Sequence, residues 1–306
     1  MQIDWDAGDA SGWRAFHAQA RAAMQQHHGF GDAMRSLGTD VRRAHLKDDQ
    51  GQTLGIAQFI VRRLGGLASL ALCSRGPVWR ENLEPERRLE GYRMLATSLP
   101  AVRPRIVLFA PPLDGMDSAE KGLTRVVTGE AIALLDLRQG PAALRAAMHP
   151  KWRNRLVAAE RGDLTVHRVG NKPAQYRWLL EREGLQRERR DYRALPSAFI
   201  PAWQEALRGD AHSMLILRAD LGREPVAAML FTVHGRAATY HLGWSSELGR
   251  EHSAHNLLLW RAINELPAMD VDRLELGAVN TQRGAALARF KIGTGATVVH
   301  YGGTFW

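Results

Sequence analysis

The spacing of apolar residues over the last eighty positions predicts alternating strands and helices. Two β-rich runs, residues 226–233 and 236–243, are separated by two residues, which predicts a tight hairpin. Between residues 254 and 266, apolar side chains recur at i, i+3, i+4 and i+7, so we expect a helix with one apolar face. The elements predicted after it are a strand over 272–277, an Ala-rich helix ending at 288–293 and a strand over 296–301.

The first half of the chain shows a similar order of elements. An amphipathic helix is predicted over residues 11–28, with Ser11 as its N-cap. The elements predicted next are strands over 41–46, 54–61 and 67–72, a helix over 85–99, a strand over 105–110, a loop over 111–121 and a strand over 131–136. We therefore predict an α/β (α+β) protein of two tandem domains, residues 1–140 and 141–306, each with a mixed sheet flanked by helices. One large mixed sheet is the alternative.

A compact helix is expected between the halves, because Pro150 suits a first helical turn and Gly162 follows its end. One side of this helix carries apolar residues. The other side carries Lys151, Asn154 and Arg155, which could donate hydrogen bonds to a phosphate or carboxylate. A solvated basic face is the alternative reading of the same pattern. Further helices are predicted over 173–193 and 202–208.

Composition indicates an ordinary soluble globular protein. Of 306 residues, 45% are apolar and 24% are charged. No stretch is long and apolar enough for a transmembrane segment and the N-terminus lacks a signal-peptide pattern, so we expect a cytoplasmic location. The single cysteine, Cys73, follows an apolar run and is expected to be a buried, inert thiol. No metal-binding pattern and no Walker-type phosphate loop is visible.

The basic net charge of the chain favours anionic binding partners. The net charge of +9 comes from 41 Lys and Arg against 32 Asp and Glu. Arginine forks suit anions, so a tRNA, a nucleotide-linked substrate, acyl-CoA or peripheral contact with an anionic membrane is expected. No recognised nucleic-acid-binding motif occurs, and no DNA partner is expected. The alternative is that many of these arginines lie on solvated faces.

Several short motifs together resemble FemAB-like (FemABX, peptidoglycan bridge-formation) transferases of the GNAT acyltransferase superfamily. The motifs of the second half are residues 240–244 (YHLGW), 256–260 (NLLLW), 290–295 (FKIGTG) and 302–304 (GGT), preceded by 149–155 (HPKWRNR). Residues 25–31 (QQHHGFG) resemble the entry to the family's N-terminal half, and His27 and His28 are expected on the surface. The resemblance implies two GNAT-like domains and transfer of an acyl or aminoacyl group to an amine. It implies no cofactor beyond the donor, aminoacyl-tRNA or acyl-CoA, and a peptidoglycan precursor as a candidate acceptor.

In a GNAT-type site two central parallel strands separate, and free backbone N–H groups polarise the carbonyl of the acyl donor. The opening is expected near residues 242–246, with the N-terminus of the helix that starts near Ser253 directed at the donor. Acetyl-CoA users normally have a glycine-containing turn here. No glycine lies between Arg250 and Asn256, which favours an aminoacyl or other non-CoA donor over an acyl-CoA-dependent N-acetyltransferase.

Candidate site residues follow from the resemblance and from strand alternation. The resemblance implies that an exposed Lys291 steadies the charge of the tetrahedral intermediate and that Phe290 lines the cleft. Tyr240 is expected on one strand face with Leu242, opposite His241, while Glu275 or His241 could serve as general base. The full prediction is a catalytic set of Lys291, Phe290, Tyr240 and Glu275, and a substrate-binding set of Lys151, Arg153, Asn154, Arg155, Trp244, Arg250 and Asn256. The remaining alternative is a catalytically silent GNAT-fold partner or an RNA-binding protein.

Overall fold

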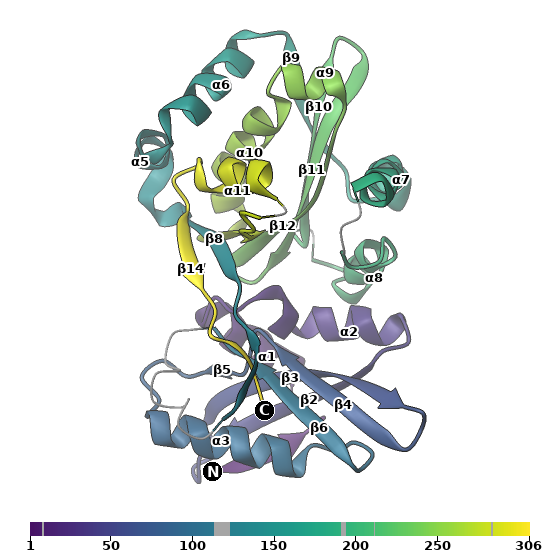
Figure 1. Ribbon diagram of the computed structural model, residues 1–306, viewed down its shortest axis with the longest axis vertical. Coiled ribbons are helices and arrows are strands. Elements are labelled where there is room, and N and C mark those ends of the chain that lie inside the picture. The colour runs from purple at the N-terminus through teal and green to yellow at the C-terminus, as the bar shows by residue number, and fades with distance from the viewer. Residues whose placement is uncertain (8, 113–122, 191–193, 211, 283) are drawn as a thin grey trace. The chain divides into compact units, whose positions relative to one another are not determined.

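The computed structural model of the chain describes residues 1–7, 9–112, 123–190, 194–210, 212–282 and 284–306 (Figure 1). It divides into two compact units, residues 1–131 with 300–306, and residues 132–299. The predicted boundary at residue 140 is therefore shifted, because β8 (Ala131–Asp136) pairs in the second sheet. The predicted second domain also loses its last residues, because β15 (Gly303–Phe305) pairs in the first sheet. Most of the loop predicted over 111–121 lies outside the described residues.

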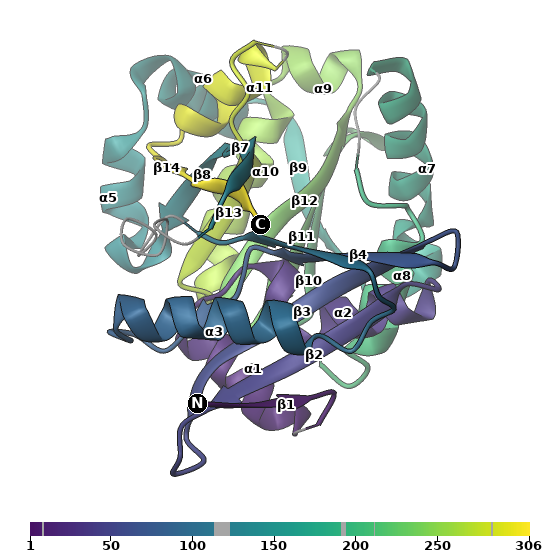
Figure 2. The same cartoon turned by 60° about the horizontal axis from the view of Figure 1, so that its bottom comes forward.

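The first unit contains a mixed sheet in the order β1-β2-β3-β4-β6-β15-β7, with β5 paired to β3. Its remaining strands are β1 (Gln2–Trp5), β2 (Asp40–Lys47), β3 (Thr53–Leu64), β4 (Ala68–Ser74), β5 (Val78–Trp79), β6 (Arg105–Ala110) and β7 (Arg125–Thr128). Helix α3 (Pro85–Ser98) covers one face (Figure 2). There Tyr92 packs edge-to-face on Phe109, which packs in turn on Phe59.

The predicted N-terminal helix is divided. Helix α1 spans Ala10–Gln19, a 3₁₀ turn spans Met24–Gln26 and α2 spans His28–Ser36. The N-cap is Asp9 rather than Ser11, because the Asp9 carboxylate accepts hydrogen bonds from the N–H groups of Ser11 and Gly12.

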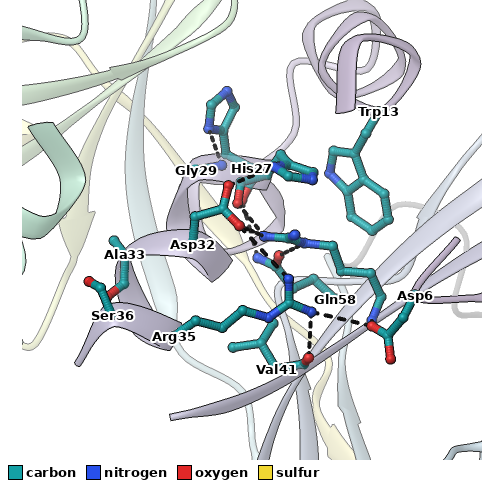
Figure 3. Close-up of polar contacts among 12 residues, drawn as sticks. Asp6, Trp13, His27, Gly29, Asp32, Ala33, Arg35, Ser36, Val41 and Gln58 are labelled. Atoms are coloured by element: carbon teal, nitrogen blue, oxygen red, sulfur yellow. Dashed lines mark hydrogen bonds and ion pairs between the residues drawn. The ribbon is translucent and has the colours of Figure 1, made fainter. Parts of the chain in front are cut away.

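A buried polar network ties α2 to the first sheet (Figure 3). The guanidinium of Arg43, on β2, lies 2.8 Å from the Asp32 carboxylate and donates to the Gln58 side chain at 2.8 Å. The Gln58 amide donates in turn to the carbonyl oxygen of His27. His27 is 4% exposed, and the ring of His28 contacts Asp32 at 2.9 Å. The prediction that both histidines are surface residues is therefore wrong, because α2 begins at His28 and packs against the sheet.

The second unit has a sheet in the order β14-β8-β13-β12-β11-β10-β9. Its other strands are β9 (Leu164–Val169), β10 (Met214–Leu221), β11 (Glu224–His234), β12 (Ala237–Ser245), β13 (Arg273–Ala278) and β14 (Thr297–His300). One face is covered by α5 (Gly140–Ala147), α6 (Pro150–Arg161), α10 (Ala254–Glu265) and α11 (Ala285–Ile292) (Figure 1). The other face carries α7 (Pro173–Arg190) and α8 (Phe199–Ala206), while the short α9 (Glu247–Glu251) follows β12. The predicted hairpin is confirmed, since β11 and β12 pair from His234 and Ala237 onward.

The two sheets are separate, which excludes the alternative of one large mixed sheet. Each contains an antiparallel hairpin, a crossover helix and a strand that returns parallel to the second strand of the hairpin. These elements are β3, β4, α3 and β6 in the first unit and β11, β12, α10 and β13 in the second. The tandem fold class predicted from the order of elements is thereby confirmed. No helix in the described part of the chain is long and apolar enough to cross a bilayer.

Replacing Asp32 by Asn should lower the free energy of unfolding by about 2–3 kcal/mol, because the guanidinium of Arg43 would stay buried without its counter-charge. Urea denaturation measures this loss. The matched control is Asp40→Asn, which breaks a more exposed pair with Arg42 and should cost less than about 1 kcal/mol. Equal losses in the two variants would show that the Arg43–Asp32 pair contributes no more than a surface pair.

Candidate active site

The central parallel strands of the second unit separate soon after they meet. The pairing of β12 with β13 covers Ala237–Thr239 and Arg273–Glu275, and no further pair of these two strands occurs in the described structure. The corresponding strands of the first unit, β4 and β6, stay paired over six residues each, Ser69–Ser74 with Arg105–Ala110. The edge of β12 from Tyr240 to Ser245 therefore faces an opening, close to the position predicted from the sequence.

A β-bulge lies where the opening begins. Leu230 of β11 pairs with Leu242 and Phe231 pairs with Tyr240, so His241 is the extra residue. The Tyr240 ring lies 5.6 Å from Phe231, whereas the His241 ring stacks on Phe199 of α8 at 5.4 Å. The prediction that Tyr240 and Leu242 share a strand face is wrong, because the bulge shifts the alternation of side chains by one residue.

Backbone donors line the open edge of β12. The carbonyl of Gly243 accepts a hydrogen bond from Gln186 at 3.0 Å, and that of Ser245 accepts one from Arg250 at 2.8 Å. Because the N–H and C=O of one strand residue point to the same side, the N–H groups of Gly243 and Ser245 are also directed to this edge. A Cβ at Gly243 would lie 2.2 Å from the Tyr240 hydroxyl, so a larger residue there would displace the Tyr240 ring.

The N-terminus of α10 lies beside the end of β12. The ring of His255 is hydrogen-bonded to the carbonyl of Trp244 at 3.0 Å, which fixes the first turn of the helix to the strand. Asn256 is 6% exposed, and its Nδ2 has no hydrogen-bond partner in the described structure. An amide that is buried and unsatisfied costs free energy, so this donor suits an acceptor group of a bound ligand.

The connection from β12 to α10 is a short helix rather than a glycine loop. The N–H groups of Arg250, His252, Ser253 and Asn256 each donate to a carbonyl of the same segment, at 2.9–3.2 Å. These amides are therefore already used and are not open to a pyrophosphate. The arrangement agrees with the absence of glycine between Arg250 and Asn256.

Phe290 sits among aromatic residues on α11. Its backbone carbonyl accepts a hydrogen bond from the Trp152 indole at 3.0 Å, and the two rings lie 5.9 Å apart. The His255 ring lies 6.3 Å from Phe290 on the other side. His255 thus connects the end of β12 with α11 and belongs to the candidate site. Sequence reasoning missed it, because a lone histidine in a first helical turn carries no distinguishing pattern.

Lys291 is buried, in contrast to the prediction of an exposed charge. It is 6% exposed, and its Nζ donates to the carbonyl of Ala278 at 2.8 Å. This hydrogen bond connects α11 to the end of β13. The side chain has a structural role in addition to any role in catalysis.

The other predicted catalytic and aromatic residues are divided between the two faces of the sheet. Tyr240 and Phe290 both pack against the core beneath α6 and α10. Glu275 is buried and is the pairing partner of Thr239, so it faces away from Tyr240. Trp244 is also buried, between Trp178 and the Arg182 guanidinium of α7. The structure thus groups Tyr240 with Phe290 and separates them from Glu275 and Trp244.

The basic residues predicted on α6 face solvent. Lys151, Asn154 and Arg155 are exposed and Arg153 is half-buried. Within the described residues, these four side chains have no hydrogen bond or ion pair. Arg145 on the neighbouring α5 instead binds Glu160 through two hydrogen bonds, of 2.6 and 2.7 Å. The donors of residues 151–155 are therefore available to an anion. No group of three or more His, Cys, Asp or Glu in the described chain is placed to hold a metal ion.

The ring of His241 should make the stability of the second unit depend on pH. Burial lowers the pKa of His241 from 6.5 to about 4, so the stability that its neutral form contributes is complete above pH 6.5. This contribution falls as the pH drops from 6.5 toward 4, because the unfolded chain then binds a proton that the native state does not. The free energy of unfolding should decrease by up to about 3 kcal/mol over this range.

Urea denaturation at pH 7.5 and at pH 4.5 measures the effect. His241→Phe keeps an aromatic ring on Phe199 and should lose less stability between these pH values than the wild type. The exposed His212, replaced by Asn, is the control and should behave like the wild type. Equal losses in wild type and His241→Phe would contradict the assignment.

The sequence and the fold were compared with known proteins. Residues 150–291 match the protein family described as the acetyltransferase (GNAT) domain. No curated protein matches the sequence. The fold is similar to the crystal structure of FemX, with a TM-score of 0.81 and 13% identity over 100% of this chain and 96% of that chain.

Two further solved structures share the architecture. L-PGS from Bacillus licheniformis gives a TM-score of 0.53 at 16% identity, covering 97% of this chain and 90% of that one. A tandem GNAT protein from the clavulanic acid biosynthesis pathway gives 0.56 at 13% identity, covering 99% and 98%. The match of residues 150–291 includes the opening between β12 and β13, which confirms the prediction of an acyltransferase. The second unit thus carries the match to the acetyltransferase (GNAT) domain, and the fold of the whole chain is similar to that of FemX.

Proposed function

We propose that the second unit transfers an aminoacyl group from an aminoacyl-tRNA to an amine, with a peptidoglycan precursor as the acceptor. The observation that carries the proposal is the open edge of β12, with backbone donors at Gly243 and Ser245 and the buried amide of Asn256 nearby. This arrangement receives an acyl carbonyl and needs no protein nucleophile. The resemblance of the motifs to FemAB-like transferases supports this donor and this acceptor.

The proposed reaction is a direct nucleophilic attack of the acceptor amine on the carbonyl group of the donor. The acceptor amine nitrogen forms a bond to the carbonyl carbon of the donor, and negative charge develops on the carbonyl oxygen. N–H groups at the edge of β12 stabilise that oxyanion. The C–O ester bond to the donor then breaks, and the proton lost by the amine leaves with the departing hydroxyl. Lys291, held at the end of β13, supplies positive charge near this step.

Two features favour an aminoacyl donor over acyl-CoA. The amides between β12 and α10 are used within α9 and the first turn of α10, which removes most donors that would bind a pyrophosphate. The basic side chains at 151–155 are unpaired in the described structure and suit the phosphates of an RNA backbone. A similar fold occurs in the C-terminal domain of a putative lysylphosphatidylglycerol synthetase from Agrobacterium fabrum, which supports an aminoacyl substrate.

The second candidate is an acyl-CoA-dependent N-acetyltransferase, which the match to the acetyltransferase (GNAT) domain favours. A ligand at a hundred times its Kd adds about 2.7 kcal/mol to the stability of the native state. We expect no rise in Tm with acetyl-CoA, and transfer from charged tRNA to an amine acceptor. A clear thermal shift with acetyl-CoA together with acetylation of an amine would reverse the order of the candidates. Salt-dependent RNA binding without turnover would indicate a non-catalytic protein.

Replacing Lys291 by Met should lower kcat on the order of 10²-fold, because the substitution removes the ammonium but keeps most of the buried volume. Steady-state transfer and Tm are measured together, since a buried lysine also contributes to stability. Arg289→Met, on the exposed side of the same helix, is the matched control and should keep its activity. Unchanged turnover in a folded Lys291→Met protein would remove this residue from the mechanism.

Replacing Lys151 and Arg155 together by Ala should raise KM for the donor, because charge-assisted contacts to phosphate are lost. The increase should shrink at high salt, where ions screen the wild-type contacts. The control is Arg208→Ala, which removes an exposed arginine paired with Glu205. The same KM for wild type and double variant at every salt concentration would assign this face of α6 to solvent.

A further inference from the structure

The turn between β3 and β4 carries exposed apolar and basic side chains side by side. Leu64 is 50% exposed and Leu67 is 80% exposed, the highest exposure of a large hydrophobic side chain in the described chain. Arg62 and Arg63 directly precede them and are also exposed. Single exposed apolar residues are common on protein surfaces, but two leucines at the end of one hairpin form a concentrated apolar tip.

This tip projects beyond both neighbouring strands. Strand β2 pairs with β3 only as far as Val61, and β6 pairs with β4 only from Ser69 onward. In the described structure, residues 62–64 therefore pair only with β4, their own hairpin partner, and the β3–β4 turn extends past the neighbouring strands (Figure 2). Gly65 and Gly66 have φ values of 59° and 76° at the centre of a tight turn, which is closed by a hydrogen bond from the Leu67 N–H to the Leu64 carbonyl at 3.2 Å.

The charge around the tip has one sign. Residues 53–80 contain no Asp or Glu, and Arg62 and Arg63 have no hydrogen-bond or ion-pair partner in the described structure. The guanidinium groups are thus available to bind phosphates.

We propose that this hairpin tip, residues 62–67, inserts into the surface of an anionic lipid bilayer. The leucines enter the boundary between headgroups and acyl chains, and the arginines bind the lipid phosphates. A second protein is a poorer fit, because a stable protein interface buries about 800 Å² on each partner and a six-residue protrusion does not supply a surface of that size. The proposal assigns to the first unit a surface that the acyl-transfer site does not use.

Co-sedimentation with vesicles tests the proposal. We expect the protein to bind vesicles of phosphatidylcholine and phosphatidylglycerol and to bind pure phosphatidylcholine weakly. Leu64→Ser with Leu67→Ser should reduce partitioning about tenfold or more. Arg62→Gln with Arg63→Gln should reduce it on the order of tenfold on anionic vesicles, and high salt should remove that difference.

Matched controls lie elsewhere on the surface. Leu185 on α7 is 54% exposed, and Leu185→Ser should leave partitioning unchanged. Arg223 is exposed in the turn between β10 and β11, and Arg223→Gln removes a charge at a distant position in the sequence. If these controls lowered binding as much as the tip variants, the proposal would be overturned in favour of non-specific attraction.

Insertion itself is measured by a probe on the tip. The single native cysteine, Cys73, is fully buried, so Leu67→Cys provides the accessible thiol for an environment-sensitive fluorophore. A blue shift on adding anionic vesicles is expected, and an unchanged spectrum would overturn the proposal. A dimer that forms without lipid and is lost in the double-serine variant would assign the tip to a second copy of the chain instead. None of these measurements depends on acyl transfer.

Discussion

The early end of pairing between β12 and β13 is the constraint on which the rest of the second unit depends. Parallel strands that stay in register satisfy each other's backbone groups, and such a sheet offers no donor to a ligand. Here the pairing ends at Thr239 and Glu275, and the bulge at His241 turns the following residues of β12 relative to the sheet. The carbonyls of Gly243 and Ser245 are then held by the side chains of Gln186 and Arg250, so the edge keeps its shape without a neighbouring strand.

In the first unit, the two central parallel strands of the same topology stay paired and leave no open edge within the described residues. Strand β4 is paired with β6 through Ser74, and the Gln26 amide fills the space at this end. Its Nε2 donates to the carbonyls of Ser74 and Gln58, and its Oε1 accepts from the N–H of Gln58. The backbone groups at the end of β4, which correspond in position to the open edge of β12, are hydrogen-bonded within the protein. The two units thus share a topology but differ in whether the central pair of parallel strands stays closed.

The sequence predicted the regular elements well, because their apolar periodicities are local properties. Helix α10 and strand β13 each lie within one residue of the predicted ranges. Features that depend on the whole fold were not predictable in this way. A bulge is one extra residue that leaves the composition of β12 unchanged, and the pairing of β15 with the first sheet requires contacts far apart in the chain. The ammonium of Lys291 donates to the Ala278 carbonyl of another element, so periodicity within α11 could not reveal its burial.

Two buried amide side chains, Gln58 in the first unit and Asn256 in the second, differ in whether their donors are satisfied. In the first unit Arg43 and Gln58 are buried, and their donors reach Asp32 and backbone carbonyls of residues 25–28. In the second unit Asn256 is equally buried, yet its Nδ2 has no acceptor in the described structure. Folding stability alone would favour an apolar residue at such a position, because an unsatisfied buried amide is a net cost. The cost is understandable if a ligand supplies the missing acceptor. Since Asn256 follows the residue that anchors α10 to Trp244, that ligand would lie beside the open edge of β12.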